Sequence, residues 1–213
     1  MGYMKNSVVQ YYYDKLTASP TQQHSAFLWW SILSQFFKFK DGYGAKLDLR
    51  SVNGELQPNI IISYLDDDDV FNSVILIDFG KEKEFAEGET ADQSSVWEEV
   101  IQRLTIDIKA ARAERGDNKE LHAIATVGTL SRFFCFAPDA EQLTDSPIIG
   151  SQILEFRRDK RAIKHTLHCL IWATSVDVMV RSVVRNRSVR VSNSPSGNSD
   201  GNQISNSESE SAL

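Results

Sequence analysis

Apolar residues along the chain alternate between helical and extended spacing. From Thr21 to Lys38, aromatic and aliphatic residues recur at helical intervals, which predicts a core helix with Thr21 or Ser25 as its N-cap. From Lys46 to Val52, apolar and charged residues alternate, which predicts a half-buried strand. Asn53-Gly54 then favours a type I′ turn, so residues 59–65 should return antiparallel to that strand.

The run from Val74 to Phe79 is almost entirely apolar, which predicts a strand buried on both faces at the centre of a sheet. Asp78 interrupts this run. A carboxylate at the end of a buried strand is costly unless it is paired, hydrogen-bonded or bound to a metal. Asp78 is therefore either part of a functional site or a cap for the loop that follows.

The second half of the chain predicts a helix, two strands and another helix. A capping box at Ser95 and an apolar stripe predict a helix that ends at Gly116. Leu121 to Val127 and Arg132 to Phe136 have the pattern of strands, and a long helix is expected from Ala162 to Arg185. Together these elements predict an α/β fold with a central mixed sheet flanked by helices.

The chain has 213 residues, which is enough for one domain with an ordinary core. We expect a lead-in over residues 1–20, the α/β domain over residues 21–187 and a disordered tail rich in Ser and Asn over residues 188–213. In the lead-in, Tyr11-Tyr12-Tyr13 favours a packing role over stacking on nucleic-acid bases.

The composition is that of a globular protein, with 41% apolar and 24% charged residues. A net charge of -6 argues against a broad, non-specific nucleic-acid surface but leaves room for a local basic patch. The N-terminus lacks a signal-peptide pattern, and charged residues interrupt the longest apolar stretch, His165 to Val184. We therefore expect an intracellular protein, cytoplasmic or nuclear, with no membrane partner. Cys135 and Cys169 are too few for a disulfide framework and are expected to be buried thiols.

Three other clusters have structural interpretations, which we favour for the first two. The acidic run from Asp66 to Asp69 lacks the spacing of a calcium loop and predicts a solvated loop. His165 and His168 could share a metal with Cys169, but no further ligand is spaced to complete a closed site. The arginines of residues 181–190 either complement a helix dipole or contact phosphate.

The order helix, strand, strand, strand, helix, strand from Thr21 to Pro138 resembles the core of the restriction-endonuclease-like PD-(D/E)XK superfamily. The resemblance is to divergent members of the kind found in fungal proteins. In that family a Pro-Asp pair opens the second strand. The third strand ends with three residues in order: an acidic residue, a residue of any type, and Lys. The resemblance implies that Asp78 and Asn59 occupy metal-ligand positions, that Lys81 serves as the catalytic lysine and that Gln102 supports the site. In such sites the acids bind Mg²⁺, which activates water, and the lysine orients that water.

The chain departs from the family pattern at two of its three motif positions. Asn59 stands where the family has Asp, and Gly80 stands where it has Lys. Lys81 comes one residue late and would point to the other face of the strand unless a bulge at Gly80 re-aims it. We therefore expect a degenerate nuclease-like domain, catalytically weak or inactive, that binds nucleic acid or a protein partner.

Two alternatives remain open. The first is an active Mg²⁺-dependent nuclease that hydrolyses phosphodiester bonds, in which Asp48 or an acidic-loop residue replaces the missing ligand. The second is a small regulatory α/β module that shares the pattern.

Overall fold

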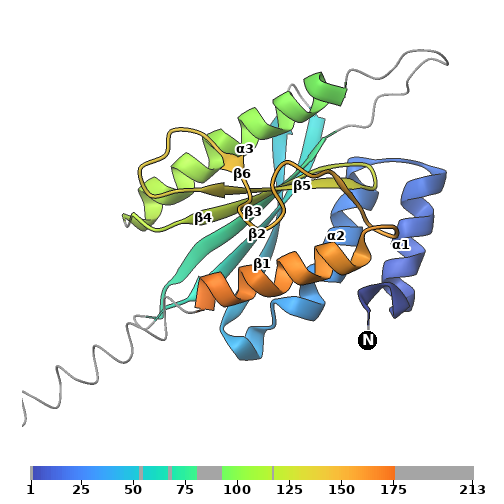
Figure 1. Ribbon diagram of the computed structural model, residues 1–213, viewed down its shortest axis with the longest axis horizontal. Helices are drawn as coiled ribbons and strands as arrows, with labels where there is room; N and C mark the ends of the chain where they lie inside the picture. The colour runs from blue at the N-terminus through green and yellow to red at the C-terminus, as the bar shows by residue number, and fades with distance from the viewer. Residues whose placement is uncertain (1, 53–54, 67–68, 81–92, 117, 176–213) are drawn as a thin grey trace, which may run out of the picture. The chain divides into compact units, whose positions relative to one another are not determined.

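The computed structural model of the protein describes residues 2–52, 55–66, 69–80, 93–116 and 118–175, all of which belong to one compact unit, Met1–Val178. Residues 160–175 form a helix that is drawn in orange, without a label, in Figure 1. The other elements are η1 (Tyr3–Lys5), α1 (Ser7–Ala18), α2 (Gln22–Phe36), η2 (Phe39–Asp41), β1 (Tyr43–Val52), β2 (Glu55–Leu65), β3 (Phe71–Gly80), α3 (Gln93–Arg115), β4 (Leu121–Val127), β5 (Leu130–Phe136), β6 (Thr144–Asp145) and β7 (Leu154–Glu155).

The strands form one seven-stranded mixed sheet in the order β1-β2-β3-β4-β5-β6, with β7 paired to β5. β1, β2 and β3 are antiparallel neighbours, β3 and β4 are parallel, and β5 is antiparallel to β4. A parallel pair needs a crossover connection, which here contains α3. The predicted α/β fold with a central mixed sheet and flanking helices is therefore confirmed (Figure 1).

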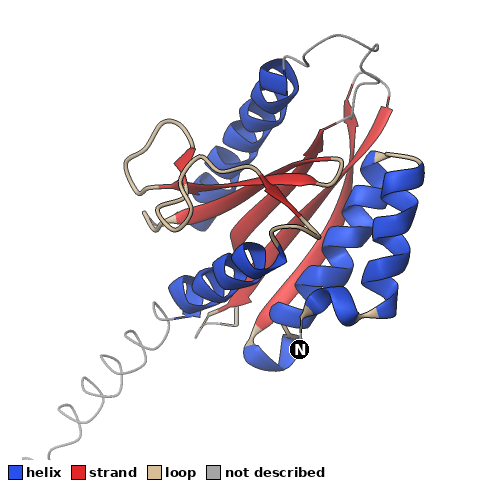
Figure 2. Cartoon of the chain, turned by 45° about the vertical axis from the view of Figure 1, so that its right-hand side comes forward, coloured by secondary structure: helices blue, strands red, loops and turns tan. Residues whose placement is uncertain are grey.

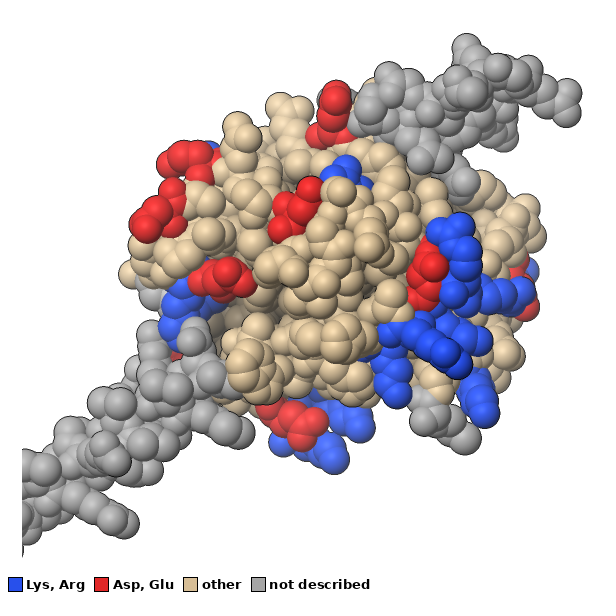
Figure 3. Space-filling model, in the orientation of Figure 1, with Lys and Arg blue, Asp and Glu red and all other residues tan. Residues whose placement is uncertain are grey.

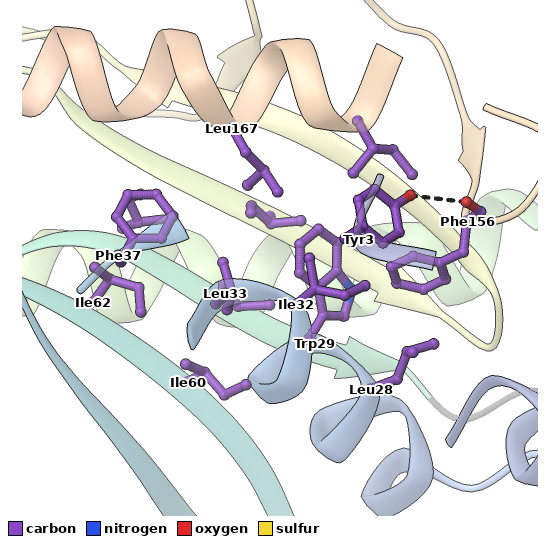
Figure 4. Close-up of a cluster of buried hydrophobic side chains, with 14 of the residues drawn as sticks. Tyr3, Leu28, Trp29, Ile32, Leu33, Phe37, Ile60, Ile62, Phe156 and Leu167 are labelled. Carbon is purple, nitrogen blue, oxygen red and sulfur yellow. Dashed lines mark hydrogen bonds between the residues drawn. The ribbon is translucent and has the colours of Figure 1, made fainter. Parts of the chain in front are cut away.

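Helices cover both faces of the sheet (Figure 2). On one face, α3 packs through Trp97, Val100 and Leu104. On the other face, α1, α2 and the helix of residues 160–175 form a larger apolar cluster around Trp29 (Figure 4). β3 lies between the two clusters and is buried from Val74 to Gly80, as its apolar run predicts for a central strand.

The N-terminal residues, expected to precede the domain, instead build part of its core. Val9 and Leu16 of α1 are 0% and 1% exposed. The Tyr3 hydroxyl donates to the Phe156 carbonyl at 2.8 Å and so connects the N-terminal segment to the segment just before the helix of residues 160–175 (Figure 4). The Asn6 side chain caps α1 by accepting from the Val8 N–H. Residues 3–18 therefore belong to the folded unit.

Other predicted elements keep their type but shift their ends. Thr21 caps α2 through its side chain, and Gly116 follows the end of α3 with a φ of 65°. β1 begins at Tyr43, earlier than expected, because the turn is completed at Gly42 with a φ of 85°.

Several predictions fall outside the described residues: the Asn53-Gly54 turn, the loop of residues 81–92, the arginines of residues 181–190 and the tail. Both cysteines are free, Cys135 buried and Cys169 partly so. None of the described helices is long and apolar enough to span a membrane.

Candidate functional site

The sheet register places Asn59 directly beside Asp78. The two residues are Cα partners in the β2–β3 pair, and Asp48 of β1 is in turn the partner of Asn59. Directly opposed residues of a sheet point to the same face. Asn59 and Asp78 are 5% and 4% exposed, so their polar groups must be satisfied within the protein. The two residues that the resemblance predicts as metal ligands thus lie together, on the face covered by α3.

Arg103 of α3 forms an ion pair with the carboxylate of Asp78. Its Nε donates to Asp78 Oδ2 at 2.7 Å, and its Nη2 donates to the Phe79 carbonyl at 3.2 Å. The other carboxylate oxygen, Asp78 Oδ1, accepts the Phe79 N–H at 2.7 Å. The Asp78 and Arg103 side chains are only 6% and 17% exposed, so this is a largely buried ion pair.

A second arginine satisfies Asn59. With the amide oriented to suit its neighbours, the Asn59 oxygen accepts from Arg50 Nε at 3.0 Å and from Arg50 Nη2 at 2.7 Å. Arg50 also forms an ion pair with Asp107 of α3 through its Nη1. Arg50 therefore links β1, β2 and α3, and the amide oxygen of Asn59 is fully used.

The backbone next to Asp78 is held from both sides of the sheet. The Phe79 carbonyl accepts from Gln22 Nε2 of α2 at 2.5 Å, in addition to its bond from Arg103. Burial raises the pKa of Asp78 above its usual range, while the hydrogen bond and charge of Arg103 act to lower it. The carboxylate is thus fixed in position, and its charge is balanced by a guanidinium.

The remaining predicted site residues do not join this network in the described part of the chain. Gln102 is exposed on α3, and the residue of that helix that reaches Asp78 is its neighbour, Arg103. Lys81 lies outside the described residues. Close packing of α3 on β3 explains the glycine at residue 80. A Cβ there would lie 2.8 Å from Val100 Cγ2, so a side chain would force its neighbours to move.

The described residues do not fit a magnesium ion in this arrangement. Mg²⁺ prefers several oxygen ligands, with carboxylates among them. Asp78 and Asn59 already accept hydrogen bonds through their oxygens, as described above. Gln57 Oε1 is buried with no hydrogen-bond partner, but a single neutral oxygen is a poor site for a divalent cation. Among the described residues, no group of three or more His, Cys, Asp or Glu residues could hold a metal.

The His165 and His168 pair also gives no metal centre in the described chain. His165 Nε2 lies 3.7 Å from Cys169 Sγ on the same helix, whereas the His168 ring packs edge-on against Phe36 with centroids 5.2 Å apart. At the start of the acidic run, Asp66 Oδ1 accepts from the Val70 N–H, whereas Asp67 and Asp68 lie outside the described residues. The contacts that are described for both clusters are local structural ones.

A second candidate surface lies where the helix of residues 160–175 begins. The ion pair between Arg157 and Asp14, 3.3 Å apart, brings α1 beside this helix start. We use the name basic surface for the exposed or half-buried cations gathered there: Lys5, Arg157, Arg158, Lys160, Arg161 and Lys164. Figure 3 shows Lys and Arg side chains concentrated on this side of the molecule, at the lower right.

The basic surface has more cations than anions. Arg157 pairs with Asp14, Arg158 pairs with Asp159 at 2.9 Å, and Glu155 adds a third carboxylate that accepts from the Arg157 and Arg158 N–H groups. Within the described residues, the other four cations of the surface make no ion pair. The helix start also carries the positive end of the helix dipole, which disfavours cations and favours anions. This local excess of positive charge lies on a chain whose net charge is -6.

Comparison of the chain with protein-family models, with curated proteins and with solved structures finds no match in any of the three.

The partners of Asp78 and Asn59, Arg103 and Arg50, were not predicted from the sequence. Arg103 and the Arg50 partner Asp107 are four residues apart on α3 and lie beside the apolar stripe, three residues after Val100 and Leu104. Charged residues spaced in this way share a helix flank with the buried face and can reach the strands below the helix. That spacing was the available signal.

Proposed function

We propose that this protein is a nuclease-like domain that does not cleave its ligand and that binds nucleic acid through the basic surface. The observation that supports loss of catalysis is the ion pair between Arg103 and Asp78. A nuclease of the resembled family needs that carboxylate to bind a metal, whereas here a guanidinium is bonded to it at 2.7 Å.

The surrounding contacts make the exchange of Arg103 for a metal costly. Arg103 is also bonded to the Phe79 carbonyl and to Glu99 Oε1, at 3.2 and 2.6 Å. A metal at Asp78 would have to displace a side chain with three partners and would gain a neutral amide at Asn59. We therefore expect Asp78 to act as a structural anion in this domain rather than as a catalytic ligand.

The basic surface supports nucleic acid as the partner. Lysine and arginine side chains bind phosphate groups, and cations without local partners have the least to lose when they do so. Lys160, Arg161 and Lys164 follow one another along the start of a single helix, which places their charges side by side. A protein partner would need a matching set of acidic side chains, whereas every nucleic acid presents a regular row of phosphates.

The binding test compares two variants with equal charge changes. Lys160→Gln/Lys164→Gln removes cations from the basic surface, and Lys38→Gln/Lys40→Gln removes two exposed cations near η2. Affinity for fluorescent single- and double-stranded DNA and RNA would be measured by anisotropy at several salt concentrations. We expect the first variant alone to weaken binding and to reduce the salt dependence by about one phosphate contact per substitution.

Equal weakening by both variants would show non-specific attraction and overturn the assignment of the surface. Failure of the wild-type protein to bind any of the four nucleic acids would overturn nucleic acid as the partner and favour a protein. Cleavage with Mg²⁺ or Mn²⁺ that disappears in Asp78→Asn would overturn the non-catalytic proposal and establish the metal-dependent nuclease instead.

A further inference from the structure

β1 forms one edge of the sheet and has backbone groups that face away from it. The strand is ten residues long, and among the described strands it pairs with β2 alone. The Leu65 N–H donates to the Gly42 carbonyl at 2.8 Å, which fixes which residues of β1 are bonded to β2. In an antiparallel pair these bonds alternate along the strand. The main-chain groups of Ala45, Leu47 and Leu49 therefore point outward.

This edge lacks several of the features that usually prevent strands from pairing. Natural edge strands are protected by proline, by bulges, by short length or by charged side chains, and of these β1 has only the charged side chains. β1 contains no proline, and it pairs with β2 from Tyr43 to Val52 without a shift in register. Its charged side chains alternate in sign, since Lys46 and Arg50 flank Asp48. Leu49, whose backbone faces outward, is also 59% exposed.

We propose that a second copy of this chain pairs with β1, antiparallel and across a two-fold axis at Leu47, so that the two sheets become continuous. The register follows from the charges. An axis at Lys46 or at Asp48 would place a charge opposite the same charge of the partner subunit. An axis at Leu47 places Lys46 opposite Asp48 of the partner subunit twice, once on each side of the axis.

The same register satisfies the backbone and covers the exposed leucine. Leu47 opposes Leu47 of the partner subunit, and Ala45 opposes Leu49 of the partner subunit, so every opposed pair at these positions has outward-facing N–H and C=O groups. An axis at Leu49 would instead place Asp48 opposite Arg50 of the partner subunit. Arg50 is already bonded to Asn59 and to Asp107, whose side chain is 12% exposed, which leaves it less free to serve a partner. Lys46 and Asp48 also pair with each other within the strand, at 3.5 Å, but their side chains are 68% and 37% exposed and can turn toward the partner subunit.

The interface would be small, so we expect a dissociation constant on the order of 10 µM. Sedimentation velocity of the full chain over roughly 1–200 µM would detect the dimer. Lys46→Asp turns both attractive pairs into repulsive ones and should raise the dissociation constant about tenfold or more. The swap Lys46→Asp/Asp48→Lys restores the opposite charges and should restore dimerisation. Lys15→Asp makes the same charge change at an exposed position of α1 and should dimerise like wild type.

Leu49→Pro tests the backbone bonds directly. The Leu49 N–H does not face β2, so proline removes no bond within the sheet but prevents one to the partner subunit. We expect this variant to be monomeric with an unchanged circular dichroism spectrum. A wild-type protein that stays monomeric up to 200 µM would overturn the proposal, as would a dimer that persists unchanged in both Lys46→Asp and Leu49→Pro.

Discussion

Arg103→Met tests whether the carboxylate of Asp78 depends on the arginine. Methionine keeps much of the apolar stem but removes every donor that reaches Asp78 and the Phe79 carbonyl. Because the Asp78 side chain is 6% exposed, the carboxylate would be left buried without its counter-charge. Removing one member of a buried pair typically costs about 3–5 kcal/mol. We expect the lower end of this range, since Arg103 is 17% exposed.

Urea unfolding at pH 7, followed by circular dichroism, measures this loss. With a typical slope of about 2 kcal/mol per molar urea, a loss of about 3 kcal/mol lowers the midpoint by roughly 1.5 M. The matched control is Gln102→Met, which makes the same kind of change at an exposed position one residue away. Such a surface change should alter stability by less than about 0.5 kcal/mol.

The pH dependence distinguishes lost charge balance from lost packing. In the folded protein the pKa of Asp78 is raised above 3.8, so protonation of Asp78 favours the folded state. That contribution is fully present below pH 3.8 and is lost as the pH rises through the folded-state pKa. Arg103 opposes this rise in the pKa of Asp78, so Arg103→Met should raise that pKa further. The stability gap between variant and wild type should therefore be largest near pH 7 and shrink as the pH falls toward 4.

The double variant Asp78→Asn/Arg103→Met completes a thermodynamic cycle. Asparagine removes the charge that the arginine balances, so the double variant should be more stable than Arg103→Met alone. A loss below about 1 kcal/mol in Arg103→Met, or a gap that stays constant from pH 7 to pH 4.5, would refute the view that Arg103 neutralises a buried charge.

Two further predictions concern packing and acid stability. Gly80→Ala should cost about 1–3 kcal/mol, because the new Cβ would lie 2.8 Å from Val100 Cγ2 and 2.9 Å from Val127 Cγ2; denaturant unfolding should show partial rescue by a second change, Val100→Ala. Burial lowers the pKa of His122 from 6.5 to about 4, so the unfolded chain binds an extra proton and stability falls as the pH drops through this window. The loss should be roughly 1–3 kcal/mol, moderated by Glu120 at 3.7 Å, and unfolding from pH 7 to pH 4.5 should be flatter in His122→Gln.

The sequence predicts the sheet well because its strands differ in burial. The continuous apolar run of β3 marks a strand covered on both faces, and the alternation in β1 marks a strand with one apolar and one polar face. The position of Asp78 beside Asn59 also follows once β2 and β3 are taken as antiparallel neighbours. These features depend on local pattern, which a single sequence contains.

The sequence does not predict features that depend on distant pairing. α1 was missed although Val9, Tyr13 and Leu16 have helical spacing, because three adjacent tyrosines obscure which side is buried. Its place in the fold depends on partners far along the chain, such as Glu155, which accepts from the Tyr13 hydroxyl at 2.8 Å. The partnership of Arg103 with Asp78 likewise depends on how α3 is rotated over the sheet, which periodicity fixes only to within a residue or so.

A buried ion pair is by itself weak evidence for stability, because the cost of desolvating both charges can exceed their attraction. Asp78 would be easier to bury as an apolar residue, in keeping with the rest of its strand. The structure keeps the carboxylate and adds Arg103, and it places a neutral Asn59 beside it under a second arginine. This pattern fits a site in which guanidinium groups hold two buried polar residues in place. A neutral residue suits position 59, since an acid there would add a second buried charge that Arg50, already paired with Asp107, would have to balance.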